Sequence, residues 1–434
     1  MEQTVYLSLL ILLFSCFNPS PKPLQNTVSQ PNVVLIVGCT LRQDRLTPYG
    51  SKNNTAPFLN QLAKMGALFE RHYAQAPWTR PSLGSILTGY YPRRLNLDSQ
   101  DRSGQSRILS QEWSTIAEFL KDAGYHTIGS TSNPNALARF GFDQGFNTYK
   151  DTQGTTLEGV LITSAQKQAE LIIKELSTIP PEIPFYAQVM TVDTHLKVHY
   201  EKEDWTALFG HKYRSKTKQQ KRIDAYDASI HYWDRHIKIL YSEIKARHPD
   251  TLFIITADHG EGLNHPKHHG DGHGNYLYPS TIHVPHLWVH PSIPAQRVTG
   301  ITRNIDILPT LLEFLNLDSS DHFDGQSYLS VLLEGGDTPA EFSIAETFFR
   351  NSNKASIVTN DHHLIRDRKK SRTSLFSISD KESNTDLSTT EQNKTKELLE
   401  QLNLWEESTP KGYGESISIT PEEKAMLQSM GYLD

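Results

Sequence analysis

The chain has 434 residues, which suits one large α/β domain with an appendage or two domains. Its 43 basic and 49 acidic residues leave a formal net charge of −6 without any long basic run, so we expect no nucleic-acid partner. The 23 prolines and 25 glycines follow no period, which argues against repeats and fibrous chains and favours ordinary globular loops.

The N-terminal region has the pattern of an export signal. Residues 5–17 form the only long apolar run, and this run is too short to span a bilayer comfortably. Residues 13–16, LFSC, resemble a bacterial lipobox, which predicts lipidation at Cys16; simple signal cleavage is the alternative, because no Lys or Arg precedes the run. We predict a signal peptide over 1–16, a polar linker over 17–30, and a lipid-anchored protein of the bacterial envelope, in the periplasm or at the outer membrane.

Strand-like and helix-like segments then alternate along the chain. Residues 32–37, NVVLIV, are apolar and β-branched without alternation, which is typical of a buried parallel strand. Further strands are predicted at 125–129, 185–191 and 251–256, and helices at 58–65, 82–87, 110–123 and 222–246. This order predicts an α/β fold with a mostly parallel central sheet flanked by helices.

The pattern changes after about residue 340. Short β-like runs separated by polar turns predict a small C-terminal α+β appendage, and the sequence from Thr420 predicts a terminal helix with Pro421 at its first position. We therefore place a catalytic domain at 31–340 and a C-terminal subdomain at 341–434.

Chemically reactive side chains follow strands or begin helices at four places. They are Cys39, Thr79, Asp193 with His195, and Asp258 with His259, the last pair leading into a loop that contains His265, His268, His269 and His273. Because the carboxyl ends of parallel strands meet at one edge of a sheet, we expect these groups to converge. Thr79 precedes a predicted helix, and its hydroxyl would lie at the helix start, where N–H groups can bind an anion. Plain N-capping of the helix is the alternative interpretation of Thr79.

Several longer sequence motifs resemble those of a known family. They are NVVLIVGCTLRQDRLTPYG, APFLNQLAKMGALFERHYAQAPWTRPSLGSILTGYYP, VDTH, TLFIITADHGEG, GHGN, NIDILPTLLEFLNL, DGQS and LQSMGYL. In order and spacing the chain from residue 31 to residue 434 resembles the sulfatase family of the alkaline phosphatase superfamily.

The resemblance implies a metal-centred site that hydrolyses a sulfate or phosphate ester through a covalent intermediate. Thr79 stands at the nucleophile position, and Cys39 stands where the first metal-binding carboxylate is usual. The implied metal ligands are Cys39, Thr79, Asp258 and His259; the implied catalytic residues are Thr79, His195 and His273; and the implied substrate contacts are Arg80, His195 and His273.

Two departures from the family pattern refine this expectation. Thr79 cannot become formylglycine, and Leu83 replaces the usual Arg of that signature, so the hydrate mechanism of typical sulfatases is excluded. The thiol of Cys39 favours one divalent ion, with zinc preferred over calcium or magnesium. Alternatively, Cys39 is a small buried hydrophobe that remains after loss of a ligand.

We therefore expect metal-dependent hydrolysis of a sulfate or phosphate ester of a small molecule, glycan or lipid. Two alternatives stay open. One is a non-catalytic relative that binds an anion or glycan. The other is a transferase like the phosphoethanolamine transferases of the same superfamily, whose VGET-type words resemble VGCT and which use threonine and zinc.

Overall fold

The computed structural model of the protein describes residues 30–97, 105–151, 156–157, 160–161, 164–195, 198–263, 272–350, 352–430 and 432–433. The expected signal peptide with Cys16, the linker before residue 30, and His265, His268 and His269 lie outside the described residues. Within these ranges no helix has both the length and the apolar character that a membrane span requires.

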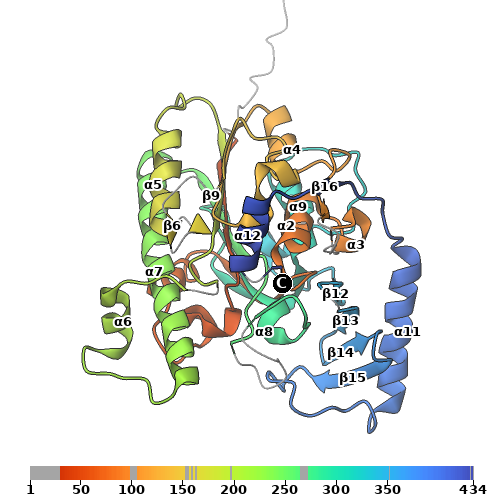
Figure 1. The fold of residues 1–434 in the computed structure, drawn as a ribbon. Coiled ribbons are helices and arrows are strands. Elements are labelled where there is room, and N and C mark those ends of the chain that lie inside the picture. The colour runs from red at the N-terminus through yellow and green to blue at the C-terminus, as the bar shows by residue number, and fades with distance from the viewer. Residues whose placement is uncertain are drawn as a thin grey trace, which may run out of the picture. The chain divides into compact units, whose positions relative to one another are not determined.

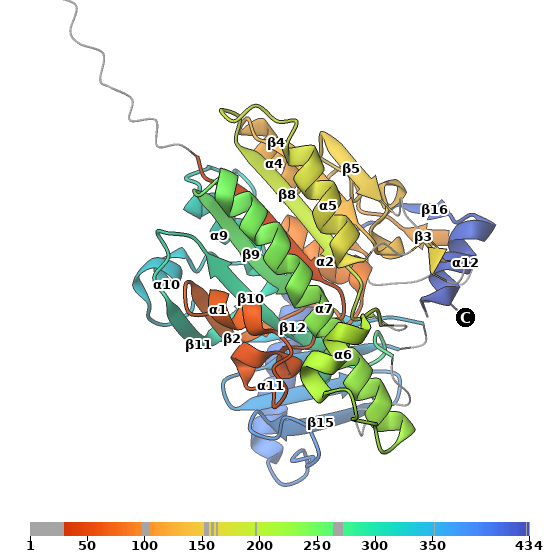
Figure 2. The ribbon, with the colours of Figure 1, turned by 90° about the vertical axis from the view of Figure 1, so that its left-hand side faces the viewer.

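An eight-stranded sheet forms the centre of the fold (Figures 1 and 2). Its strand order is β11 (Gln296–Arg303), β2 (Ala67–Tyr73), β10 (His283–Val289), β9 (Thr251–Ala257), β1 (Asn32–Gly38), β8 (Phe185–Thr191), β4 (His126–Thr131) and β5 (Thr148–Asp151). Strand β10 runs antiparallel to both of its neighbours, and the other pairs are parallel. The prediction of a mostly parallel sheet is confirmed.

Strand β1 lies at the middle of the sheet and is buried on both faces. Its side chains alternate between two cores: Val33, Leu35 and Val37 enter one, and Val34 and Ile36 enter the other. A strand covered on both faces needs apolar residues at every position, which is why its sequence shows no alternation.

Helices cover both faces. The face that receives Val34 and Ile36 is covered by α1 (Pro57–Leu62), α5 (Ala165–Leu176) and α7 (Lys218–Arg247), and α6 (Lys202–Phe209) packs on α7. The opposite face is covered by α2 (Thr79–Thr88), α4 (Ile116–Asp122), α9 (Ile307–Phe314) and α10 (Leu329–Glu334), and α3 (Pro92–Leu95) follows α2.

Short elements connect the strands to these helices. They are the 3₁₀ helices η1 (Gln43–Arg45), η2 (Thr47–Tyr49), η3 (Pro134–Ala136), η4 (Ala138–Phe140) and η5 (Asn304–Asp306), the helix α8 (Pro279–Ile282), and the two-residue strands β6 (Thr156–Leu157) and β7 (Val160–Leu161).

The C-terminal region forms a second, antiparallel sheet, as the sequence predicts. Its strands are β12 (Ser343–Thr347), β13 (Lys354–Val358), β14 (His362–Asp367) and β15 (Arg372–Ser377), and α11 (Gln392–Ser408) packs on them. The chain then returns to the main sheet region, where β16 (Ser416–Ser418) pairs with β3 (Gln105–Arg107) and α12 (Pro421–Ser429) contacts η3. Residues 31–434 form one compact unit, and the domain boundary at 340 stays a prediction.

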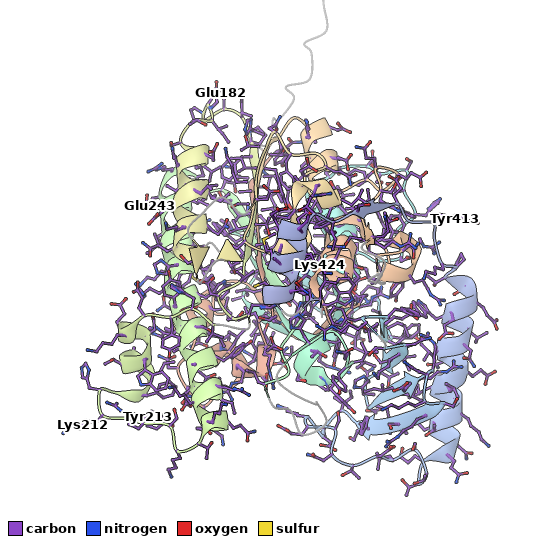
Figure 3. The ribbon with its side chains drawn as sticks, viewed as in Figure 1. Glu182, Lys212, Tyr213, Glu243, Tyr413 and Lys424 are labelled. Carbon is purple, nitrogen blue, oxygen red and sulfur yellow. The ribbon has the colours of Figure 1, made fainter. Side chains whose placement is uncertain are left out.

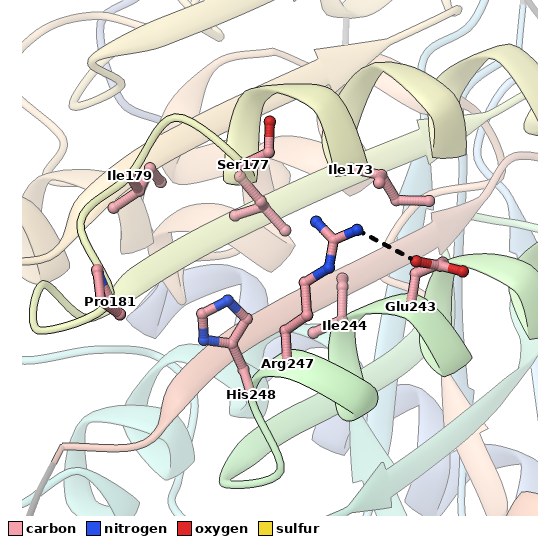
Figure 4. Close-up of a pocket in the computed structure, with 9 residues that line it drawn as sticks. Ile173, Ser177, Ile179, Pro181, Glu243, Ile244, Arg247 and His248 are labelled. Atoms are coloured by element: carbon pink, nitrogen blue, oxygen red, sulfur yellow. Dashed lines mark hydrogen bonds and ion pairs between the residues drawn. The ribbon is translucent and has the colours of Figure 1, made fainter.

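A hollow of about 260 Å³ lies between the C-terminal ends of α5 and α7 (Figure 4). Arg247 and Glu243 form an ion pair of 3.4 Å in its lining. Both helices lead into the amino ends of strands β8 and β9. The hollow therefore lies at the sheet edge opposite to the carboxyl ends, where the predicted chemistry lies.

Candidate active site

The predicted residues converge at the carboxyl edge of the sheet. Strands β9, β1, β8 and β4 are consecutive neighbours. The residues that follow them are Asp258 after β9, Cys39 after β1, His195 after β8 and Asn133 after β4. Adjacent parallel strands thus bring together groups that are far apart in sequence, as expected for an open α/β sheet.

Asp258 and His259 are fully buried members of this group. Asp258 Oδ1 accepts hydrogen bonds from the backbone N–H groups of Thr40 (3.2 Å) and His259 (2.8 Å). Asp258 Oδ2 has no hydrogen-bond partner among the described residues and lies 3.4 Å from His259 Nε2. His259 Nδ1 lies 2.8 Å from the Gly260 carbonyl, which only accepts, so Nδ1 carries the proton and Nε2 presents a lone pair.

Electrostatics favour a cation between these two side chains. Burial lowers the pKa of His259 to about 3, so the ring is neutral at pH 7. The lone pair of His259 Nε2 and the unpartnered oxygen of Asp258 therefore face each other without a proton between them. Such an arrangement suits a positive ion held by both.

Cys39 completes the group through a strained turn. Thr40 adopts the left-handed conformation with φ +60°, which costs a β-branched residue about 1–3 kcal/mol. This turn directs the Thr40 N–H to Asp258. Cys39 Sγ accepts a hydrogen bond from Asn133 Nδ2 (3.1 Å), and burial followed by the Asp258 charge raises the pKa of the thiol well above its usual value.

Thr79 is the first residue of α2 and is completely buried. The N-cap of this helix is Trp78, and no side chain caps the helix, so the capping interpretation of Thr79 is wrong. Thr79 Oγ1 lies 3.0 Å from Asn133 Nδ2, 3.3 Å from His259 Nε2 and 2.9 Å from the Tyr432 hydroxyl. Its hydroxyl therefore belongs to the site and not to the helix.

Helix α2 is anchored to the strand that carries Asp258. Ser82 Oγ donates to the Asp258 carbonyl (2.5 Å). Asn304, which lies in η5, links the two elements, because its Nδ2 donates to Ser82 Oγ (3.4 Å) and to the Ala257 carbonyl (3.2 Å). All residues of α2 are buried. These contacts fix the start of the helix, and with it Thr79, against the end of β9.

Two further histidines face the same space. The rings of His195 and His273 are 5.0 Å apart at 77°, and His273 lies 4.4 Å from the His259 ring. His273 Nδ1 lies 3.2 Å from Glu261 Oε2, and burial lowers the pKa of His273 to about 3. An ionised carboxylate only accepts, so the neutral ring keeps its proton on Nδ1 and offers Nε2 as an acceptor.

Arg80 and Asp193 support the site from outside it. The Arg80 guanidinium donates to Ser106, to the Arg107 carbonyl (3.0 Å) and to Asn135 (3.0 Å). Burial lowers the pKa of Arg80 to about 9, and no carboxylate lies within ion-pair distance of it among the described residues. Asp193 accepts from the first N–H of α5 (3.0 Å), and burial raises its pKa to about 7.

Sequence reasoning missed three members of the site. Asn133 follows the predicted strand at 125–129, so the rule that found Asp258 would also have found it. Glu261 lies within the DHGEG motif, directly beside the predicted residues Asp258 and His259. Tyr432 stands in the motif LQSMGYL, which carried the resemblance but assigned no role to this tyrosine. Burial raises the pKa of its phenol well above the usual value, and its hydroxyl lies 3.1 Å from His195 Nε2.

The predicted metal ligands fit a divalent ion. Ligand atoms of Cys39, Asp258 and His259 all lie within 4.8 Å of one another, and Thr79 Oγ1 is 3.7 Å from Cys39 Sγ. These four atoms comprise one sulfur, one nitrogen and two oxygens, a set that tetrahedral zinc accepts. The second oxygen of Asp258 supplies a buried group that has no hydrogen-bond partner among the described residues.

Comparison with known proteins shows the family of the chain. The family model described as "Sulfatase" matches residues 31–317. The chain belongs to the sulfatase family. Enzymes of this family generally bind a divalent metal ion.

Three named sulfatases are similar to this chain, each over a different share of its length. The ulvan-active sulfatase of Formosa agariphila is 24% identical over 73% of this chain and 68% of that protein. The steryl-sulfatase of Mus musculus is 35% identical over 29% of this chain and 22% of its own length. The extracellular sulfatase SULF-1 homolog of Drosophila melanogaster is 24% identical over 70% of this chain, which spans only 31% of that relative.

Solved structures show the same fold. A protein in complex with its substrate D-glucosamine-2-N,6-O-disulfate gives a TM-score of 0.72 at 16% identity, covering 88% of this chain and 98% of that chain. The phosphonate monoester hydrolase of Agrobacterium radiobacter gives a TM-score of 0.69 at 19% identity, covering 90% of this chain and 100% of that chain.

We expect Asp258→Asn to stabilise the metal-free protein by about 1 kcal/mol, because the new amide can donate to His259 Nε2 where Asp258 Oδ2 now lacks a partner. The measurement is chemical unfolding in the presence of a chelator. Asp234→Asn is the matched control: both oxygens of Asp234 accept backbone N–H bonds, from Phe58 and Leu59, so this variant should lose stability. Equal losses in the two variants would contradict the assignment.

Proposed function

We propose that the protein hydrolyses sulfate or phosphate esters with Thr79 as its nucleophile and one divalent metal ion beside it. The proposed ligands of this ion are Cys39, Thr79, Asp258 and His259. The observation that carries the proposal is the position of Thr79 Oγ1. It is buried at the start of α2 and lies 3.3 Å from His259 Nε2 and 3.0 Å from Asn133 Nδ2.

The reaction would proceed in two displacements. In the first, Thr79 Oγ forms a bond to the sulfur or phosphorus atom, and the bond from that atom to the ester oxygen breaks. In the second, water breaks the bond to Thr79 and releases inorganic sulfate or phosphate. The rings of His195 and His273, of which His273 is neutral, are the groups available to take the hydroxyl proton and to deliver a proton to the departing oxygen.

The surroundings of Thr79 favour an anion. No described side chain caps the N-terminus of α2, so its first N–H groups, those of Thr79 and Arg80, are available to an anion, and Asn133 adds a side-chain donor. Arg80 contributes a buried positive charge that no described carboxylate neutralises. When bound, the divalent ion supplies further positive charge, which lowers the pKa of the Thr79 hydroxyl and offsets charge on an ester oxygen.

Zinc is the ion that these donors favour. A thiolate, an imidazole and a carboxylate are all common zinc ligands, whereas calcium and magnesium prefer sets composed of oxygen. Asn133 Nδ2 donates to Cys39 Sγ at 3.1 Å, which supports a sulfur that bears negative charge.

Sulfated or phosphorylated compounds, including glycans, are the proposed substrates. The support comes from the named relatives: an ulvan-active sulfatase, a structure that contains a disulfated glucosamine, and a phosphonate monoester hydrolase. A hydroxyl nucleophile places phosphate esters beside sulfate esters in this proposal, because no formylglycine can form at Thr79.

Thr79→Ala should lower turnover of p-nitrophenyl sulfate, p-nitrophenyl phosphate or a phosphodiester by roughly 10³-fold or more, because the covalent step loses its nucleophile. Stability should change little, because Thr79 caps no helix. Thr79→Ser retains a hydroxyl and is the matched control, which should keep measurable activity. Full activity in a folded Thr79→Ala protein would remove Thr79 from the mechanism.

Metal analysis should find one zinc per chain, and Cys39→Asp should shift the preference towards harder ions such as Mn²⁺ or Mg²⁺. The readouts are bound metal by mass and rate after reconstitution with each ion. A wild-type protein that binds no stoichiometric metal, together with activity that appears only in Cys39→Asp, would identify the natural chain as a non-catalytic anion-binding relative.

We further propose that the chain is exported to the bacterial envelope and carries a lipid on Cys16. The support is the apolar run at 5–17 that ends in LFSC. Mass spectrometry should detect an acylated N-terminal cysteine in the wild type, and Cys16→Ser should stay in the aqueous phase on detergent partition. An unmodified wild-type chain that also partitions into water would refute the anchor.

A further inference from the structure

The Tyr432 side chain occupies the centre of the site. Its hydroxyl lies 2.9 Å from Thr79 Oγ1, 3.1 Å from His195 Nε2 and 3.3 Å from Asn133 Nδ2. The Tyr432 ring packs against the rings of His195 and His273, at 5.4 Å from each. The three residues expected to be catalytic therefore all contact one phenol that comes from near the chain's last described residue.

These contacts are the ones that an ester oxygen would need. For in-line attack, the sulfur or phosphorus atom must come within about 3–3.5 Å of the nucleophile, with its oxygens on the surrounding donors. The Tyr432 hydroxyl already sits 2.9 Å from Thr79 Oγ1 and within reach of the Asn133 amide. An ester group and this phenol cannot occupy the space at the same time.

The site is also closed to solvent. Thr79, Asp258 and His259 are 0% exposed and Tyr432 is 0% exposed. A substrate can reach Thr79 only after a covering segment has moved. Among the described residues, the segment that touches Thr79, His195 and His273 together is the one that carries Tyr432.

We propose that Tyr432 and helix α12 form an internal plug that competes with the anionic substrate for the active site and must withdraw before substrate binds. The plug regulates access to the site assigned above, so its meaning for catalysis rests on the proposed function. The competition itself does not depend on the proposed function, because the phenol occupies the position of an oxyanion whether or not the chain is an enzyme.

The attachment of α12 suits a segment that opens locally. Leu427 and Met430 anchor it in the core, and the Tyr432 N–H bonds back to the Leu427 carbonyl (2.9 Å). Arg139 and Glu423 form an ion pair that is partly exposed, and a capping box at Thr420 starts the helix. Short segments that depend on few buried apolar contacts open at lower cost than the core.

The outer side of α12 faces solvent. Lys424 is exposed on this helix, and Figure 3 labels it. In Figure 1 the helix lies in front of α2, whose first residue is Thr79. Withdrawal of α12 therefore meets no other described layer on its solvent side. The buried apolar side chains that leave the interior are Leu427, Met430 and Tyr432, and the partly buried Met426 and Leu433 leave with them.

The test uses two readouts that need no turnover, on the full chain with Cys16→Ser so that Cys39 is the only thiol. The first is the rate of Cys39 alkylation by iodoacetamide in a chelator, since Cys39 Sγ lies 4.0 Å from the Tyr432 hydroxyl. The second is the affinity for inorganic phosphate by calorimetry. Tyr432→Ala should raise both by about tenfold or more, because it removes a competitor that keeps most molecules closed.

Two variants separate the plug from simpler explanations. Leu427→Ala loosens α12 without touching a polar group of the site, so it should shift both readouts in the same direction by a smaller factor, and it decides the matter if Tyr432→Ala does not fold. Tyr413→Ala, on a side chain that is 96% exposed and labelled in Figure 3, should match the parent in both.

The possible results distinguish failure of the plug from failure of the proposed hydrolysis. Weaker phosphate binding in Tyr432→Ala would overturn the plug and make the phenol a donor within the anion site. Unchanged Cys39 alkylation in both Tyr432→Ala and Leu427→Ala would also overturn it. If both readouts rise while every variant lacks esterase activity, the plug stands and the proposed hydrolysis fails.

Discussion

The carboxyl group of Asp258 and its own backbone carbonyl hold the candidate site together. Through Oδ1 the side chain binds the Thr40 N–H and so fixes the turn that follows β1. Through its carbonyl, Asp258 receives the Ser82 hydroxyl of α2. One residue therefore sets the position of a strand end and of a helix start, and the second carboxylate oxygen is left facing His259 Nε2.

Burial determines how this group must behave. The pKa of His259 and that of His273 fall to about 3, so both rings are neutral, and the pKa of the Cys39 thiol rises. Without a cation the site combines an unpartnered carboxylate oxygen with a neutral lone pair, which is an unfavourable pairing. The left-handed backbone of Thr40 adds a second local cost to the stability of the same group.

The sequence is most informative where local chemistry alone determines structure. The apolar runs at 32–37, 185–191 and 251–256 needed no partner to be recognised, and β1, β8 and β9 match them within a residue. The predicted helix at 58–65 ends at Leu62 in the structure, and the one at 110–123 begins only at Ile116. Strands β2, β10 and β11 escaped prediction because their stability comes from pairing with distant segments and not from their own pattern.

The residues of the candidate site also divide into those that local sequence could place and those that it could not. Cys39, His195 and Asp258 could be placed from sequence because each follows a strand and the order of parallel strands brings such ends together. Arg80 could not be placed, because the direction of a long side chain depends on Ser106 and Asn135, which lie elsewhere in the chain.

Tyr432 is the extreme case. No periodicity or turn chemistry links it to Thr79, from which it is separated by 353 positions. Its place is fixed by how the chain returns after the second sheet, through the pairing of β16 with β3 and the packing of Leu427 and Met430. Contacts between segments so far apart in the sequence leave little trace in local sequence. They are also the contacts that can be undone without unfolding the rest.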